Sequence, residues 1–268
     1  MPSQFSTIGF SIASGEDLAA LASHVADKAE RISTPPGDYL KWAPPSGEQL
    51  WLQISPEGDA MGMSAHFAGK SVIRVAVEAR VKLPTHTPLD GTFLAWANPP
   101  EQAATGGDYP FAFDCPDAAT HLELMLPATL TAQVAAFAQQ VTLFESAAAH
   151  AASQAAQGAT SPSRSFIPSG LISPAGEPVS PPAPHALIAG HVVEADTRAN
   201  AVSGAPFVWA LVDTLGGTFD VVIDPELLPR MPRPGDVLAG WFWLSGRLLA
   251  GPARKKNAGG WLQRLVGR

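Results

Sequence analysis

The stretch FVWALVDTLGGTFDVVID, residues 207–224, decides the fold of the second half of the chain. β-branched and aromatic residues lie on both sides of Gly216 and Gly217, and such residues favour strands. A Gly-Gly pair between two such runs is typical of a tight β-hairpin, because glycine readily adopts positive φ. The stretch therefore predicts two antiparallel strands, over residues 207–215 and 218–224.

The segments on either side of this hairpin are also predicted to be strands. Residues 186–198 form a long β run that contains Gly190. Residues 237–249 follow a Pro-Gly-Asp turn and are strongly apolar, with three consecutive aromatic residues. Residues 185–251 are therefore predicted to be a small all-β barrel.

This predicted barrel resembles an OB-fold. The residues that carry the resemblance are Gly190 in the first strand, the hairpin at residues 211–222 and the segment 234–237 that leads into the last strand. The resemblance implies that the first strand curves at its glycine and that ligands lie on the face of the second and third strands. A fifth strand is not found after Leu249.

The first 156 residues predict a separate α+β domain with a mainly antiparallel sheet. A strand over residues 5–12 precedes a helix that begins at Ser14, because Ser14 and Asp17 have the spacing of a capping box. Three strands then complete a β-α-β-β-β order, at residues 38–43, 48–55 and 60–67. This order resembles half of a vicinal-oxygen-chelate (glyoxalase-like) unit, whose members bind a divalent metal through His and Glu.

The rest of this domain is predicted to be mostly strands, at residues 71–83, 92–97, 109–114 and 120–126. Residues 130–156 fit either one helix or a strand to Phe144 followed by a helix capped by Ser146, and the second is favoured. Residues 157–184 are dense in Pro, Ser and Gly, which predicts a linker whose apolar island at residues 165–167 docks on a neighbour. No internal repeat of fixed period is visible.

Composition and charge exclude several classes of protein. With 46% hydrophobic and 15% charged residues among 268, the chain is not wholly disordered. A single cysteine excludes a disulfide scaffold and predicts a cytoplasmic protein. No signal peptide, membrane span or nucleotide-binding glycine motif is found, and no cofactor is predicted. Residues 1–184 carry 8 basic against 17 acidic residues, whereas residues 252–268 form a basic tail without acids.

These features predict a non-enzymatic binding or adaptor protein, with a protein partner. Its contact surface is expected on the exposed face of the barrel and on the tail, at Trp209, Phe219, Trp241, Trp243, Arg247, Lys255 and Lys256. Because side chains alternate along a strand, either Phe242 faces inward and both flanking tryptophans outward, or the reverse. Binding of single-stranded nucleic acid by base stacking is one alternative, and the oligomeric state is left open.

A second alternative is a metal-dependent or small-molecule-binding enzyme of glyoxalase-like topology. His121 and Glu123 lie two residues apart on a predicted strand and so share a face, and His66 is a possible third ligand. Cys115 lies between Asp114 and Pro116, an acidic setting that disfavours the thiolate.

Overall fold

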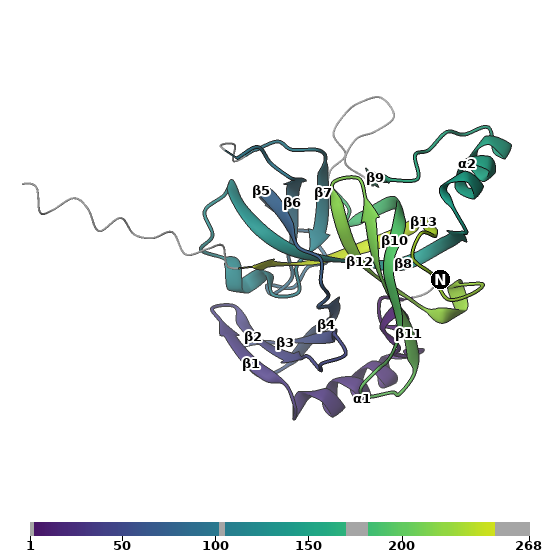
Figure 1. Ribbon diagram of the computed structural model, residues 1–268. Coiled ribbons are helices and arrows are strands. Elements are labelled where there is room, and N and C mark those ends of the chain that lie inside the picture. Colours follow the sequence, from purple (N-terminus) through teal and green to yellow (C-terminus); the bar gives the residue numbers. More distant parts are fainter. Residues whose placement is uncertain (1–2, 102–104, 170–181, 250–268) are drawn as a thin grey trace, which may run out of the picture.

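The structure is a computed structural model that describes residues 3–101, 105–169 and 182–249 (Figure 1). Strands make up 48% of it and helices about 14%, in two sheets. The chain is therefore a mostly β protein with few helices, which confirms the coarse fold class predicted from the sequence. Within the described part, no helix is both long enough and apolar enough to cross a membrane.

One helix and a four-stranded antiparallel sheet form the N-terminal layer. The helix α1 (Gly15–Ala26) begins after Ser14, whose hydroxyl accepts from the Asp17 N–H while the Asp17 carboxylate accepts from the Ser14 N–H. The predicted capping box is thus confirmed. The strands follow as a meander: β1 (Glu30–Thr34), β2 (Gly37–Trp42), β3 (Glu48–Ile54) and β4 (Ala60–Phe67).

The strand predicted over residues 5–12 is wrong. Ser6–Ile8 form a 3-10 turn, η1, which ends at Gly9 with φ 83°. The hydroxyls of Ser3 and Ser6 each accept the backbone N–H of the other residue, at 3.1 and 3.2 Å. Because such local bonds compete with strand pairing, this apolar segment folds as a turn.

Nine further strands form the second sheet. In chain order they are β5 (Ile73–Val81), β6 (Thr92–Ala97), β7 (Pro110–Asp114), β8 (Ala128–Phe144), β9 (Ser165–Pro168), β10 (His185–Ala199), β11 (Pro206–Thr214), β12 (Gly217–Ile223) and β13 (Val237–Leu249). The hairpin predicted at Gly216 joins β11 to β12. The favoured prediction for residues 130–156 is also confirmed, because α2 (Ala147–Ala156) follows β8 and its cap Ser146 accepts from the Ala149 N–H.

The nine-stranded sheet closes into two five-stranded rings that share the long strands β8 and β13. These two strands pair antiparallel from Phe144 beside Val237 to Thr131 beside Leu249. In the first ring β5, β6 and β7 pair in that order between β8 and β13. In the second ring β12, β11 and β10 pair in that order between β8 and β13. Ring closure leaves these strands few unpaired edges.

Each ring is built by the same order of elements, which reveals an internal structural repeat. Three strands in a meander, a 3-10 turn and a long strand occur as β5, β6, β7, η2 (Ala118–His121) and β8, and again as β10, β11, β12, η3 (Pro225–Leu227) and β13. The sequence hides this repeat because the loops differ in length: residues 98–109 join β6 to β7, whereas residues 215–216 join β11 to β12.

Strands from both sides of the predicted linker belong to this sheet. β8, before residues 157–184, pairs with β12 and β13, which follow them. β8 is thus the fifth strand of the ring formed with β10, β11, β12 and β13, whereas the sequence analysis looked for that strand after Leu249. Within the predicted linker, β9 pairs with β10, and the buried Phe166 stacks on Tyr109 with ring centroids 4.4 Å apart. The predicted docking of this apolar island is confirmed for Phe166.

Apolar side chains pack in two main layers. One cluster lies inside the two rings and includes Phe93, Phe111, Phe219 and Phe242. The second lies between the N-terminal layer and the outer face of β8, β11, β12 and β13. It joins Phe10, Trp42, Leu50 and Phe67 to Phe207, Trp209 and Trp243. The N-terminal layer therefore covers one outer face of the rings, below them in Figure 1.

Gly190 in β10 lies too close to β11 to carry a side chain. A Cβ there would meet Val212 Cγ1 at 2.5 Å and the carbonyl oxygen of Asp213 at 2.7 Å. We expect Gly190→Ala to lower the free energy of unfolding by about 1–3 kcal/mol, the usual cost of overpacking. Urea denaturation measures it. Gly15→Ala, where a Cβ would meet nothing within 4 Å, is the control and should lose no stability. Equal stabilities of the two variants would contradict the prediction.

Candidate metal centre

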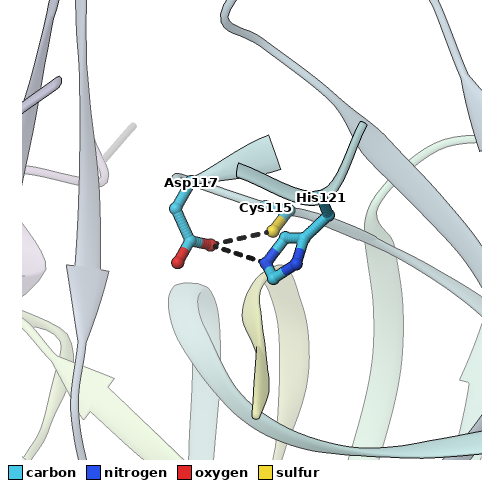
Figure 2. Close-up of side chains that lie close together, drawn as sticks. All are labelled: Cys115, Asp117 and His121. Atoms are coloured by element: carbon cyan, nitrogen blue, oxygen red, sulfur yellow. Dashed lines mark hydrogen bonds and ion pairs between the residues drawn. The ribbon is translucent and has the colours of Figure 1, made fainter. Parts of the chain in front are cut away.

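Three side chains with metal-binding atoms come together where β7 ends: Cys115, Asp117 and His121 (Figure 2). Cys115 Sγ lies 3.1 Å from Asp117 Oδ1, and His121 Nε2 lies 3.6 Å from the same oxygen. The three ligand atoms all lie within 4.8 Å of one another. In the part of the chain that the structure describes, no other group of three or more His, Cys, Asp or Glu side chains meets in this way.

A strand end and a helical turn fix the backbone of this cluster. The Cys115 N–H donates to the carbonyl of Gly91 at 2.8 Å, which holds the end of β7 beside the start of β6. The N–H and the hydroxyl of Thr120 both donate to the carbonyl of Asp117, at 2.9 and 2.8 Å, and so form η2. Asp117 caps this short turn and His121 ends it, and the turn brings the two side chains together, with Oδ1 and Nε2 3.6 Å apart.

The strand predicted over residues 120–126 is therefore wrong. His121 ends η2, and Glu123 lies exposed in the following turn rather than beside His121 on a sheet face. Two backbone oxygens of this segment bind an arginine instead of a strand, since the Arg80 guanidinium donates to the carbonyls of His121 and Leu124. These carbonyls are thus satisfied without a neighbouring strand.

Arg247 on β13 holds the Asp117 carboxylate from the other side. Its Nε and Nη2 atoms lie 2.9 and 2.8 Å from Asp117 Oδ2. The guanidinium also lies over the Trp51 ring, 4.9 Å from its centroid. Arg247 engages Oδ2, so Oδ1 is the oxygen that faces Cys115 and His121. Such partners of a ligating carboxylate orient it for the metal.

The electrostatics of the cluster place the negative charge on Asp117 and the proton on Cys115. Burial alone would raise the pKa of Asp117, but the imidazole of His121 and the guanidinium of Arg247 outweigh it and hold that pKa well below its usual range. Burial, with the Asp117 carboxylate nearby, raises the pKa of the Cys115 thiol well above its ordinary value. The thiol is thus protonated at neutral pH, and the causes are burial and Asp117 rather than the flanking Asp114 on which the sequence prediction rested.

A buried nitrogen in the cluster makes no hydrogen bond, and its approach to Asp117 Oδ1 is 3.6 Å. His121 Nε2 is shielded from solvent and makes no hydrogen bond, although the side chain as a whole is 22% exposed. A buried polar atom left unpaired costs free energy, and a metal would satisfy it. Asp117, His121 and Arg247 line a cavity of about 480 Å³ with largely apolar walls, formed by Ile32, Leu124, Leu130, Leu248 and Leu249.

The three ligand atoms lie near enough to one another to bind one ion, all within 4.8 Å. With bonds of about 2.0 Å to O and N and about 2.3 Å to S, a tetrahedral Zn²⁺ separates its ligand atoms by about 3.3–3.5 Å. Oxygen to sulfur would be about 3.5 Å and oxygen to nitrogen about 3.3 Å in such a site. The metal-free distances from Asp117 Oδ1 are 3.1 Å to sulfur and 3.6 Å to nitrogen, so shifts of a few tenths of an ångström would complete the geometry. A thiolate with an imidazole favours Zn²⁺ over Mg²⁺ or Ca²⁺, which take oxygen ligands.

The metal set predicted from the sequence, His66, His121 and Glu123, is not brought together. His66 lies fully buried on β4, where its Nδ1 lies 2.9 Å from Ser245 Oγ and its Nε2 lies 2.8 Å from Gln133 Oε1. Both of its ring nitrogens are thus engaged in the core. Only His121 belongs to the observed cluster.

The predicted aromatic contact face is covered. Trp209 and Trp243 are 1% and 4% exposed, because the N-terminal layer packs over them, and Phe219 lies inside a ring. The indole N–H of Trp209 donates to Asp220 and that of Trp243 donates to Asp114, each at 2.8 Å. Base stacking needs an open ring face, and these three side chains offer none.

The other predicted contact residues have different surroundings. Of the two options for β13, the structure shows Phe242 in the ring interior and the tryptophans outside. Trp241 is half-buried and stacks on His185, with centroids 5.6 Å apart. Arg247 is engaged by Asp117. Lys255 and Lys256 lie outside the described residues.

Two of the three clustered residues, Cys115 and Asp117, are not among the site residues predicted from the sequence. The signal that could have found them is the spacing Cys-x-Asp-x-x-x-His after a strand. Asp after a strand commonly starts a turn, which brings the residue four positions later back to it. The prediction of a strand over residues 120–126 concealed this spacing.

Comparison with known proteins assigns no family to this chain. No protein-family profile, curated protein or solved structure matches it. The functional inference therefore depends on the residues of the cluster and on their geometry.

Proposed function

We propose that the protein binds a divalent transition metal, best matched by Zn²⁺, through Cys115 Sγ, Asp117 Oδ1 and His121 Nε2. The observation that carries the proposal is the meeting, within 4.8 Å, of a thiol, a carboxylate oxygen and a buried imidazole nitrogen that makes no hydrogen bond. Arg247 orients the carboxylate as its outer partner. This proposal agrees with the metal-dependent alternative predicted from the sequence, but its ligands differ from the predicted His66, His121 and Glu123.

Three protein ligands leave one tetrahedral position open, as in catalytic rather than structural zinc sites. Asp117 and His121 line the cavity of about 480 Å³, so a water or a small substrate could reach a metal held there. Such a metal would supply Lewis-acid activation of the bound molecule. The cavity walls would hold its apolar part, and Arg247 lies beside the centre as a fixed positive charge.

Metal titration of the purified full chain tests this proposal. We expect one equivalent of Zn²⁺ to bind, and Co²⁺ to give a thiolate charge-transfer band in the near ultraviolet. His121→Ala should weaken Zn²⁺ binding by more than about 100-fold, because loss of a ligand costs more than loss of an outer partner. Glu123→Gln is the control, since Glu123 is close by in sequence but exposed and outside the cluster. Equal binding by the two variants, or no binding by the parent protein, would overturn the proposal.

We also infer that each ring is an OB-like barrel. What supports this is the closure of five strands, three of them in a meander, and the close approach at Gly190 in the first strand of the second ring. The adaptor role, the protein partner, the nucleic-acid alternative, the glyoxalase-like resemblance and the cytoplasmic location stay predictions. The covered positions of Trp209, Phe219 and Trp243 exclude these three from any such contact surface.

A further inference from the structure

A groove of about 410 Å³ lies between helix α2 and the outer face of the sheet, apart from the metal centre. Strands β8, β9, β10 and β13 supply its floor, and α2 stands to one side of them in Figure 1. Ile167 on β9 and Leu187 on β10 are direct cross-strand neighbours. They are 52% and 46% exposed, so they form an adjacent pair of exposed apolar side chains in the groove.

His150 on α2 lines the same groove and carries an unpaired nitrogen. The side chain is only 2% exposed, and its Nδ1 atom is buried without a hydrogen-bond partner. Its ring lies edge-to-face against Phe144, with centroids 5.0 Å apart. A buried polar atom without a partner is destabilising. Nδ1 is thus a hydrogen-bonding atom for which no described residue supplies the partner.

The chemistry of the lining defines what could supply that group. Among the described residues, no Asp, Glu, Lys or Arg lines the groove, so these residues offer no counter-charge to an ion. Apolar side chains form much of the floor, and polar side chains of α2 and of its C-cap form one wall: Ser153, Gln154 and the capping Gln157. Half of the lining residues are apolar or glycine and half are polar, which suits a small molecule with an apolar body and a hydrogen-bonding group.

We propose that this groove is a second binding site, for a neutral and mainly apolar small molecule with one hydrogen-bonding group that pairs with His150 Nδ1. The apolar body lies on Ile167 and Leu187, and Phe144 holds the imidazole in place. The proposal is independent of the metal centre, because the groove and the metal cluster have no lining residue in common.

Two fluorescent probes that share one scaffold test the ligand class. N-phenyl-1-naphthylamine is neutral and apolar and carries one N–H, whereas 8-anilino-1-naphthalenesulfonate adds a sulfonate. We expect the neutral probe to bind the full chain at least about tenfold more tightly, because burying an unpaired charge is costly. Tighter binding of the anionic probe, or no binding of the neutral one, would overturn the proposal.

A matched pair of variants on one strand locates the site. Leu187→Asp places a charge in the groove, whereas Val193→Asp places it at a residue of β10 that is 48% exposed and outside the groove. We expect Leu187→Asp to weaken binding of the neutral probe more than about tenfold and Val193→Asp to leave it unchanged. Equal effects would place the probe elsewhere and contradict the proposal. If Leu187→Asp does not fold, Ile167→Asp takes its place.

His150→Phe separates a ligand-binding role from a structural one. Phenylalanine keeps a ring against Phe144 but removes the unpaired nitrogen, so the midpoint temperature of unfolding should rise or stay unchanged. Binding of the neutral probe should nevertheless weaken by about five- to tenfold, the value of one hydrogen bond. A variant that binds as tightly as the parent would contradict the role of His150, and so would one that loses stability.

Discussion

Replacing Asp220 with alanine is expected to lower the free energy of unfolding by about 3–5 kcal/mol, because several buried donors lose the acceptor that they share. Asp220 is fully buried on β12. Its Oδ1 accepts from the Lys70 N–H at 2.9 Å and from Trp209 Nε1 at 2.8 Å. Its Oδ2 accepts from the N–H and hydroxyl of Ser71, at 2.8 and 2.6 Å, and from Gln133 Nε2 at 3.3 Å. Alanine would leave these donors unpaired in the core.

The same network continues through the core and fixes the orientation of each member. Because Gln133 donates its amide N–H to Asp220, its Oε1 faces His66 and must accept from His66 Nε2–H. His66 Nδ1 is then the acceptor for the Ser245 hydroxyl. Burial, with the nearby Arg247 charge, lowers the pKa of His66 to about 4, so the ring is neutral at pH 7 as this arrangement requires. Asp220 thus links β12, β8, β4 and β13.

Urea denaturation of the full chain measures the effect of Asp220→Ala. Asp196→Ala is the control, because Asp196 is exposed on the adjoining part of the sheet, and its loss should change stability by less than about 0.5 kcal/mol. A difference between the two variants below about 1 kcal/mol would mean that the five donors find other partners, and the network would then not be a main source of stability.

Features encoded by neighbouring residues could be predicted from the sequence. The Ser14 cap, the hairpin at Gly216 and the cap of α2 at Ser146 each depend on a few adjacent residues, and all three are present. The strand expected at residues 120–126 was wrong because β propensity there is weaker than the turn begun by Asp117.

Features that depend on distant parts of the chain could not be predicted in this way. Trp209 and Trp243 lie on an outer sheet face, which for Trp243 is one of the two options that alternation left open. The N-terminal layer covers that face, and no local pattern records this cover. The same holds for β8, which completes rings formed with strands far along the chain. The metal cluster is an intermediate case, since its three residues are close in sequence but Arg247 joins them from β13.

The affinity for Zn²⁺ is expected to rise about tenfold for each unit of pH between pH 7 and pH 8.5. A metal binds the thiolate, and burial together with the Asp117 carboxylate raises the pKa of the Cys115 thiol well above its ordinary value. The thiol is therefore protonated in the metal-free protein over this whole range, and each Zn²⁺ that binds must displace one proton. Asp117 adds no pH dependence there, because its pKa is held well below its usual range.

Competition with a chelator of known pH dependence measures this slope, and titration calorimetry in buffers of different ionisation enthalpy counts the released proton. Cys115→Ser is the decisive variant, because a serine hydroxyl in the same place has no thiol proton to lose. It should bind Zn²⁺ far more weakly and with a flat pH profile. If the parent protein instead shows no pH dependence, the thiolate is not a ligand and the metal is held without Cys115. If Cys115→Ser keeps the slope, the displaced proton belongs to another group, and the assignment of sulfur to the centre is wrong.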